Sequence, residues 1–124
     1  MDIEITKRAP LTSATLHILL ALAKSDLHGY GIIKEVVHNS DGHYRLGPGT
    51  LYDNLKKLMA AGLVAEAPTP SRSKHKSADK KEEDLRLYTL TITGRDALAA
   101  EVERLQGVVS KARLRLREAK AGRA

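Results

Sequence analysis

The sequence predicts a mainly α-helical fold with a small β-hairpin, in the order of a winged helix-turn-helix. Three observations support this fold class. Three amphipathic helical segments come first, two short β-rich runs around a charged loop follow, and a long segment with helical periodicity ends the chain. A length of 124 residues suits one domain with a modest core and a helical extension.

Composition narrows the classes of function. Without Phe or Trp, the core must consist of Leu, Ile, Val and Ala with some Tyr. The net charge of +6 favours a polyanionic partner, either nucleic acid or a membrane surface. The absence of cysteine excludes disulfides, thiolate metal sites and cysteine nucleophiles. The longest apolar run, residues 18–23, is too short to span a bilayer, and the charged start has no apolar signal segment, so we expect a cytoplasmic protein without a membrane span.

The first helix is predicted to begin just after Pro10, with Thr12 or Ser13 as its cap. Leu16 and Leu20 fall on one face of this helix together with other leucines. The apolar face is broad, which indicates a helix that is buried on more than one side.

The second helix is predicted over residues 29–38, followed by a turn at 39–42 and a short strand at 43–46. His28 stands directly before this helix. We assign His28 a structural role, capping or hydrogen bonding at the helix start, in preference to a chemical one.

The third helix is predicted from about Pro48 to residue 61, with Gly62 at its C-terminal cap. At about 100° per residue, one face is apolar and packs on the first two helices. This face consists of Leu51, Leu55, Leu58 and Met59. The opposite face carries Gly49, Thr50, Asp53, Lys56, Lys57 and Ala60, with Tyr52 at the flank.

The outward face of the third helix suits DNA. In a helix-turn-helix the start of the second helix of the motif meets base edges, and Thr50, Asp53 and Asn54 occupy that start. Hydroxyls such as that of Tyr52 can bind phosphates or bases, and Lys56 and its neighbour Lys57 supply positive charge. The alternative is that the two lysines only keep an exposed face solvated.

The wing of the predicted fold is a strand at 64–67, a polar loop at about 69–84 and an apolar run at 85–92. The loop is basic first and acidic last. Its candidate phosphate contacts are Arg72, Lys74 and Lys76. The alternative is that the loop is a solvated insertion without a DNA contact.

The last helix is predicted from residue 93 to about Glu118, with a frayed tail after it. Six of its residues repeat at intervals of four and three, the 3.5-residue period of a helix packed along another helix. These seam residues are Leu98, Val102, Leu105, Val109, Ala112 and Leu116. We expect them to form a homodimer interface, with Leu16 and Leu20 of the first helix packing on the partner's last helix.

Three segments resemble the PadR-type transcriptional regulators. Residues 28–35, HGYGIIKE, are similar to the family's HGYxIxxE motif. Residues 49–64, GTLYDNLKKLMAAGLV, are similar to GTLYxxLxxLxxxGLI, and residues 86–94, RLYTLTITG, to RxYxLTxxG. Together the three segments extend the resemblance over residues 11–98.

The resemblance implies a cytoplasmic, sequence-specific DNA-binding homodimer, commonly a repressor relieved by a small molecule. It divides the chain into a winged helix-turn-helix DNA-binding domain at 1–92 and a dimerisation helix with its tail at 93–124. The single helix after the wing is similar to the short subgroup of the family. Without Trp, any effector pocket at the dimer seam must be aliphatic, so we expect a small hydrophobic effector or none.

Two residues depart from the family pattern. Gly47 stands where Ser is common before the third helix, and glycine still serves there as an N-cap. Asp53 stands where Pro is common. An acid near a helix start suits the helix dipole and can accept a hydrogen bond from cytosine.

Other functions are less favoured. No nucleophile motif or phosphate-binding loop occurs, so we expect neither an enzyme nor a cofactor. His38 and His43 flank Asp41, but no third ligand has suitable spacing, so no metal site is expected. Tyr30 and Tyr88 fall in apolar patterns and are predicted to lie in the core. The alternative function is a winged-helix module for protein or RNA contacts that has no operator.

Overall fold

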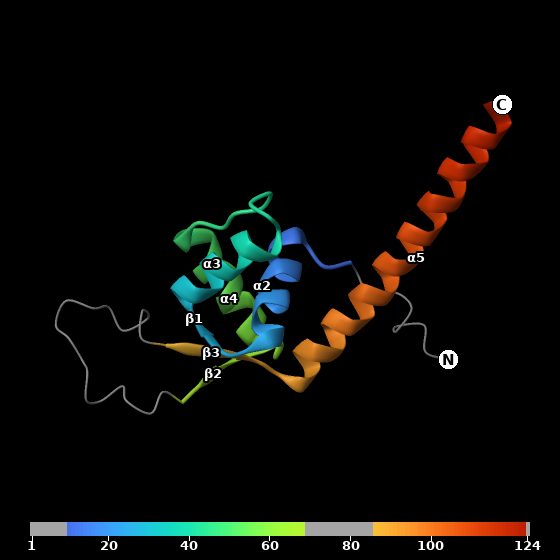
Figure 1. Cartoon of the computed structure of the whole chain (residues 1–124). Coiled ribbons are helices and arrows are strands. Elements are labelled where there is room, and N and C mark those ends of the chain that lie inside the picture. Colours follow the sequence, from blue (N-terminus) through green and yellow to red (C-terminus); the bar gives the residue numbers. More distant parts are fainter. Residues whose placement is uncertain (1–9, 69–85, 124) are drawn as a thin grey trace, which may run out of the picture.

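The computed structural model describes residues 10–68 and 86–123. Its elements in chain order are α2 (Ser13–Lys24), β1 (Leu27–His28), α3 (Gly29–Asn39), α4 (Pro48–Ala60), β2 (Val64–Ala67), β3 (Leu87–Leu90) and α5 (Ile92–Arg123). Helices α2, α3 and α4 form one group above a small sheet, and α5 projects away from that group (Figure 1). The mainly helical winged helix-turn-helix that the sequence predicts is therefore confirmed.

The sheet is antiparallel, with β3 in the middle and β1 and β2 on either side. Strands β2 and β3 pair from Val64↔Leu90 to Ala67↔Leu87, and they form the base of the predicted wing. The predicted wing loop at 69–84 lies outside the described residues. The sequence did not predict β1, whose two residues are defined only by their pairing with β3.

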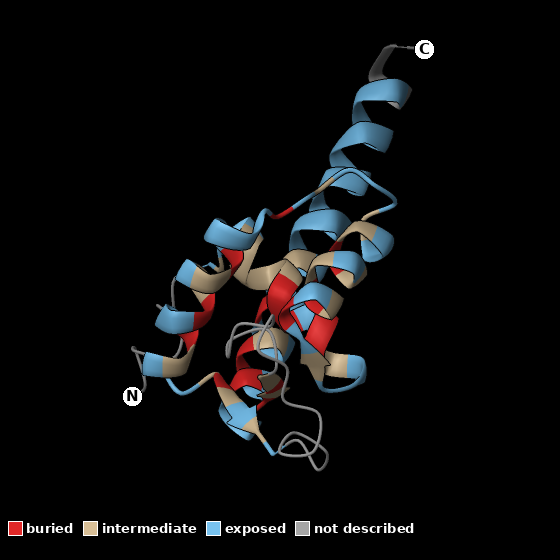
Figure 2. Cartoon of the chain, turned by 90° about the vertical axis from the view of Figure 1, so that its left-hand side faces the viewer, coloured by how far each residue is buried: buried red, intermediate tan, exposed pale blue. Residues whose placement is uncertain are grey.

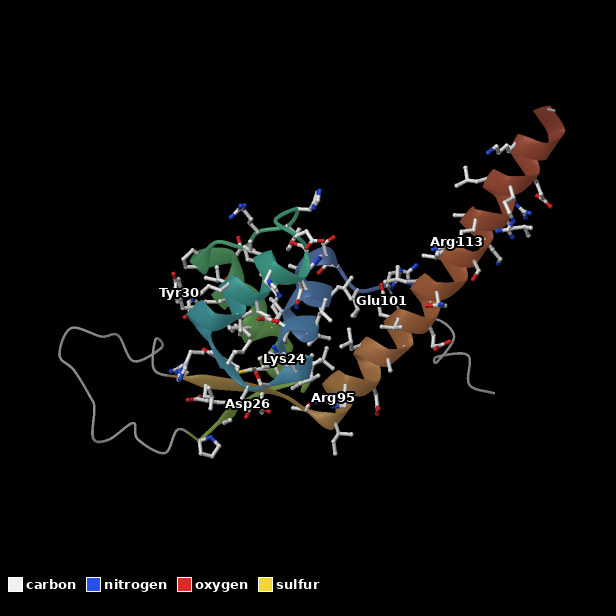
Figure 3. The ribbon with its side chains drawn as sticks, viewed as in Figure 1. Lys24, Asp26, Tyr30, Arg95, Glu101 and Arg113 are labelled. Carbon is white, nitrogen blue, oxygen red and sulfur yellow. The ribbon has the colours of Figure 1, made fainter. Side chains whose placement is uncertain are left out.

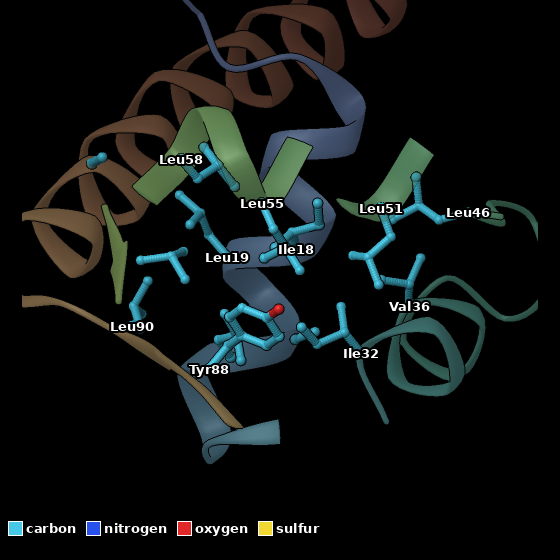
Figure 4. Close-up of a cluster of buried hydrophobic side chains, with 14 residues drawn as sticks. Ile18, Leu19, Ile32, Val36, Leu46, Leu51, Leu55, Leu58, Tyr88 and Leu90 are labelled. Atoms are coloured by element: carbon cyan, nitrogen blue, oxygen red, sulfur yellow. The ribbon is translucent and has the colours of Figure 1, made fainter. Parts of the chain in front are cut away.

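The core is aliphatic around one buried tyrosine, as the composition predicts. Side chains of α2, α3 and α4 meet below α4, and the ring of Tyr88 from β3 closes the cluster (Figure 4). Its fully buried members are Ile18, Leu19, Leu22, Ile32, Val36, Leu51, Leu55, Val64 and Tyr88. The placement of Tyr88 in the core is confirmed, since its exposed fraction is 1%.

Local signals in the sequence set the helix ends. Thr12 caps α2, because its side-chain oxygen accepts a hydrogen bond from the N–H of Thr15 at 3.1 Å. Helix α4 begins with Pro48 in its first turn and ends in a Schellman motif, in which Leu63 N–H donates to Leu58 O at 2.9 Å. Gly62 takes the left-handed conformation that this motif needs, with φ of 79°.

Helix α5 is longer than the sequence predicts at both ends. It begins at Ile92, so this residue is not part of a strand, and it continues to Arg123, past the predicted end near Glu118. The start is fixed by Thr91, whose hydroxyl oxygen accepts the N–H of Gly94 at 2.9 Å. The hydrophobic alternation before Ile92 suggested a strand, but the cap at Thr91 ends it.

The predicted strand at 43–46 is wrong. These residues connect α3 to α4 without strand pairing. Ser40 holds the segment, because its Oγ accepts the N–H of Tyr44 at 2.9 Å and donates to the Tyr44 carbonyl at 3.1 Å. Leu46 is buried and Tyr44 is half-buried, so the alternation in the sequence reflects packing on the core and no sheet partner.

Candidate nucleic-acid interface

The outward face of α4 is exposed from its first turn to its last. Leu51, Leu55 and Leu58 point into the core, which turns the opposite face toward solvent. The exposed residues of that face include Thr50, Asp53, Lys56 and Lys57, and this set is named the α4 face below. The N-cap Gly47 makes no side-chain hydrogen bond, and Pro48 and Gly49 beside it are exposed as well. A surface can therefore approach the α4 backbone closely at this end.

Asn54 lies at the edge of the α4 face and is half-buried. Its amide nitrogen donates to the carbonyl oxygen of Thr50 at 2.8 Å, one turn earlier in the same helix. This bond holds the amide beside Thr50. Two of the three predicted base-reading residues therefore stand together at the start of α4.

Tyr52 does not belong to the α4 face. It is half-buried and packs against the core, and its ring lies over Gly29 at the start of α3. A Cβ on Gly29 would overlap the Tyr52 hydroxyl. Tyr52 thus joins the two helices of the helix-turn-helix and brings their first turns together.

Tyr30, the residue after Gly29, corrects one prediction. It was expected in the core, but its exposed fraction is 71%. Its ring lies under the ammonium of Lys34, with 5.4 Å between Nζ and the ring centroid. Figure 3 shows Tyr30 on the side of the domain that faces away from α5. The sequence pattern did not predict this exposure, because an apolar stripe does not show which residues in the first turn of a helix lie beyond the edge of the core.

The base of the wing is tied to the start of α3. His28 Nδ1 lies 2.9 Å from the carbonyl oxygen of Arg86, and Leu27 pairs with Tyr88 across β1 and β3. The structural role predicted for His28 is confirmed, although its side chain bonds to the wing and does not cap α3. Arg86 also approaches Glu66 on β2, with 3.8 Å between Nε and Oε2. The candidate wing contacts Arg72, Lys74 and Lys76 lie outside the described residues.

The predicted dimer residues divide into two groups. Leu98 and Leu105 on α5 and Leu16 on α2 are already half-buried within the single chain. The others are exposed: Leu20 (41%), Val102 (48%), Val109 (46%), Leu116 (70%) and Ala112. Figure 2 shows the outer part of α5 as exposed on the side in view, while its first turns pack against the domain.

Glu101 marks the point where α5 leaves the domain. Its side chain is 5% exposed and receives two hydrogen bonds from Arg104, at 3.1 Å and 2.7 Å. This hydrogen bonding by Arg104 lowers the pKa of Glu101, and a hydrogen bond with the Leu11 backbone lowers it further, although burial acts in the opposite direction. The buried carboxylate therefore links α5 to the segment that leads into α2.

Within residues 10–68 and 86–123, no three His, Asp or Glu side chains gather closely enough to hold a metal ion. In the same described part of the chain, no helix is both long and apolar enough to cross a membrane. His43, a candidate ligand in the sequence, places its Nδ1 3.0 Å from the carbonyl oxygen of Ser40.

The fold and this surface define a winged-helix protein with an exposed second helix in its helix-turn-helix. The family model for the PadR-like transcriptional regulators matches residues 18–100. The chain therefore belongs to the PadR-like family of transcriptional regulators, and the resemblance read from the sequence is confirmed.

Two relatives match most of the chain, and one of them is a transcriptional regulator. Transcriptional regulator Rv3488 of Mycobacterium tuberculosis is 33% identical over 91 residues, which are 73% of this chain and 74% of the relative. An uncharacterised 37.1 kDa protein in transposon TN4556 of Streptomyces fradiae is 36% identical over 99 residues. Those residues are 77% of this chain but only 25% of the Streptomyces protein.

Solved structures agree with the fold. A PadR family transcription regulator from Clostridium difficile R20291 is 23% identical, with a TM-score of 0.65, over 85% of this chain and 99% of that one. Bacillus subtilis PadR in complex with operator DNA is 25% identical, with a TM-score of 0.57, over 74% of this chain and 47% of that one.

Proposed function

We propose that this chain is a sequence-specific DNA-binding regulator that inserts the start of α4 into the major groove. The observation that carries the proposal is the exposed α4 face, whose first turn consists of small residues and a threonine above a fully buried leucine face. In a helix-turn-helix this is the end that reaches base edges. The B. subtilis relative in complex with operator DNA supports the proposal at the level of the fold.

Each residue of the surface has a proposed role. Thr50 and Asn54 read bases, and Asp53 accepts a hydrogen bond from cytosine. Lys56 and Lys57 contact phosphates, which fixes affinity for any sequence. Tyr52 positions α4 against α3 through its contact with Gly29.

We add Tyr30 and Lys34 to the phosphate contacts. Both stand on the first turns of α3, which the Tyr52–Gly29 contact holds beside the first turn of α4. In this fold class the first helix of the motif crosses the DNA backbone. The wing residues Arg72, Lys74 and Lys76 are proposed to contact phosphates as well.

The protein is further proposed to act as a homodimeric repressor in the cytoplasm, relieved by a small hydrophobic effector at the dimer seam. The exposed apolar residues of α5 and Leu20 of α2 support a dimer, because a single chain leaves them in water. A two-fold dimer would place two α4 helices about one DNA turn apart. Regulation through expression level alone, with no effector, is the alternative.

Selection of binding sites from random duplexes tests the function. We expect an enriched sequence, and Asn54→Ala should weaken binding to it by about 1–3 kcal/mol with little effect on random DNA. Lys56→Ala should weaken both DNAs alike and reduce the salt slope by about 1. Lys24→Ala, at the exposed end of α2, is the matched control and should bind as the parent does.

Two results would contradict this function. If no sequence is enriched, a module for protein or RNA contacts becomes the better account. If a sequence is enriched but both α4 variants bind it like the parent, then α4 is not the helix that reads it.

A further inference from the structure

Helix α5 changes its charge along its length. Residues 92–104, which pack on the domain, have a net charge of −1. Residues 108–120, named the basic segment below, contain Lys111, Arg113, Arg115, Arg117 and Lys120 but only one acid, Glu118, for a net charge of +4. One helix thus joins a slightly acidic docked half to a strongly basic projecting half.

Every residue of the basic segment is exposed. The segment extends beyond the domain in both Figure 1 and Figure 2, and Arg113 stands far from Tyr30 in Figure 3. It is therefore a surface separate from the α4 face. Among residues 10–68 and 86–107, no acidic side chain forms an ion pair with it.

The cations of the basic segment repel one another. Lys111 and Arg115 are four residues apart, as are Arg113 and Arg117, so each pair shares a helix face. Like charges at this spacing destabilise a helix. Only Arg115 has an acidic neighbour in the segment, since its Nη1 lies 3.3 Å from Oε1 of Glu118. An external anion would relieve the remaining repulsion.

The arrangement of the basic residues also leaves room for a dimer. On a helical wheel, Lys111 and Arg115 lie on one side of the seam residues, and Arg113, Arg117 and Lys120 lie on the other. Pairing through the seam would cover the apolar stripe and keep both basic flanks exposed. It would also bring two segments of net charge +4 together, so a second copy cannot balance their charge.

We propose that the basic segment of α5 is a second, sequence-independent site for the phosphate backbone of duplex DNA. Its 13 residues extend for about 20 Å. Duplex DNA carries about one negative charge per 1.7 Å, or about twelve over that length, so it offers more than enough charge to match the segment. The helix has few hydrogen-bonding side chains other than Lys and Arg here, which suits phosphate contact and not base readout.

The proposal does not depend on the function proposed for α4. Random-sequence duplex is the probe, so no operator is needed. Arg113→Gln with Arg117→Gln removes two cations of one flank and keeps good helix formers. Lys24→Gln with Arg95→Gln removes the same charge from exposed positions outside the basic segment, and it is the matched control.

We expect the Arg113/Arg117 variant to reduce the salt slope of random-duplex binding by about 2. Its affinity should fall about tenfold or more at 0.1 M salt, and the control should stay within about twofold of the parent. Combined with Lys56→Ala, the losses should multiply, because the two sites are separate. If Lys56→Ala weakens operator binding but the Arg113/Arg117 variant keeps the salt slope of the parent, the proposal for the basic segment is wrong. The proposal that α4 binds the operator would still hold.

Two further results would overturn it. Self-association of the Arg113/Arg117 variant is measured by sedimentation. Because the substitutions remove like charges, the variant should associate as strongly as the parent. The first contrary result is a variant that associates more weakly than the parent and binds DNA normally once its concentration is high enough for association. The loss of DNA binding would then result from weaker self-association and not from lost phosphate contacts. Binding of the parent to vesicles rich in anionic lipid, lost in the variant while its DNA slope is unchanged, would assign the segment to a membrane surface.

Discussion

The ring of Tyr52 on α4 lies against Gly29 at the start of α3, so closely that a methyl group on Gly29 would overlap the Tyr52 hydroxyl and the adjacent ring carbon. The close approach of the two helices of the helix-turn-helix therefore depends on Gly29 having no side chain. Because Gly29 is buried and Tyr52 is half-buried, neither can move away without repacking.

Gly29→Ala should destabilise the protein by about 1–3 kcal/mol, since overpacking forces the Tyr52 ring out of its place. Urea unfolding measures this change. Tyr52→Phe should partly rescue Gly29→Ala, because it removes the atom that overlaps most. Gly49→Ala is the control: nothing lies within 4 Å of a Cβ there, so it should stabilise α4 by up to about 1 kcal/mol. Equal effects at the two glycines would contradict the close approach.

Tyr30 tests the proposed contact of α3 with DNA. Its side chain is 71% exposed, so Tyr30→Ala should change the free energy of unfolding by less than about 0.5 kcal/mol. DNA binding should nevertheless weaken on specific and random duplexes alike, as expected for a backbone contact. Tyr30→Phe removes only the hydroxyl and keeps the ring under Lys34, so it shows whether the hydroxyl or the ring contributes to DNA binding. Parent-like DNA binding by Tyr30→Ala would remove α3 from the interface.

Sequence patterns predicted the helices well but not the residues at their edges. The cap at Thr12 and the glycine at 62 are local signals, and both operate as local rules expect. The exposure of Tyr30 and the unpaired segment at 43–46 depend on where neighbouring elements end, which no local pattern contains. The contact between Tyr52 and Gly29 joins residues 23 positions apart, so only the fold reveals it.

Thr91 connects the wing, the turn after α4 and the start of α5. Its hydroxyl donates to the Gly62 carbonyl at 2.6 Å and accepts from Gly94 N–H at 2.9 Å, and its own N–H donates to the Leu63 carbonyl at 3.1 Å. Thr91→Val should cost about 1–2 kcal/mol, because it removes both hydroxyl hydrogen bonds, one of which caps α5. Thr91→Ser keeps the hydroxyl and should lose less than half as much in urea unfolding. A loss as large in the serine variant would point to packing of the methyl group.

Glu101 should make stability depend on pH in the acid range. Hydrogen bonding by Arg104 holds its pKa in the folded protein below the ordinary glutamate value of about 4.3. A lowered folded-state pKa gives stability that is complete above the unfolded-state pKa and is lost as the pH falls through the folded-state pKa. We therefore expect urea midpoints to fall below about pH 4.3, and Glu101→Gln to flatten that fall.

The control for Glu101 is Glu118→Gln. Glu118 pairs with Arg115 on an exposed helix surface, and such pairs contribute little to stability. Its substitution should leave the acid profile of the parent unchanged. An acid profile that is the same in Glu101→Gln as in the parent would show that other carboxylates govern it.

The dimer seam is weaker than its sequence pattern suggests. Leu98 and Leu105 are already half-buried in the single chain, so Val102, Val109 and Leu116 supply most of the new burial. A two-fold dimer buries these three side chains on both copies, and because each is only about half to two-thirds exposed, each gains about half of the 1.5–3 kcal/mol of full burial. The six side chains together gain about 5–9 kcal/mol, against an association cost of about 4–15 kcal/mol. A stable dimer therefore needs more surface, and Leu20 of α2, 41% exposed, is one apolar residue that we expect to add it.

Val102→Glu or Val109→Glu should produce monomers that keep the winged domain folded, since both side chains are about half exposed in the single chain. These monomers should also lose operator binding, because the proposed dimer engages the DNA with two α4 helices. Ser110→Glu places the same charge on an exposed position outside the seam and should remain dimeric. Sedimentation at micromolar concentration measures the assembly. A parent that sediments as a clean monomer and still binds its operator tightly would disprove both the dimer and the paired geometry on DNA.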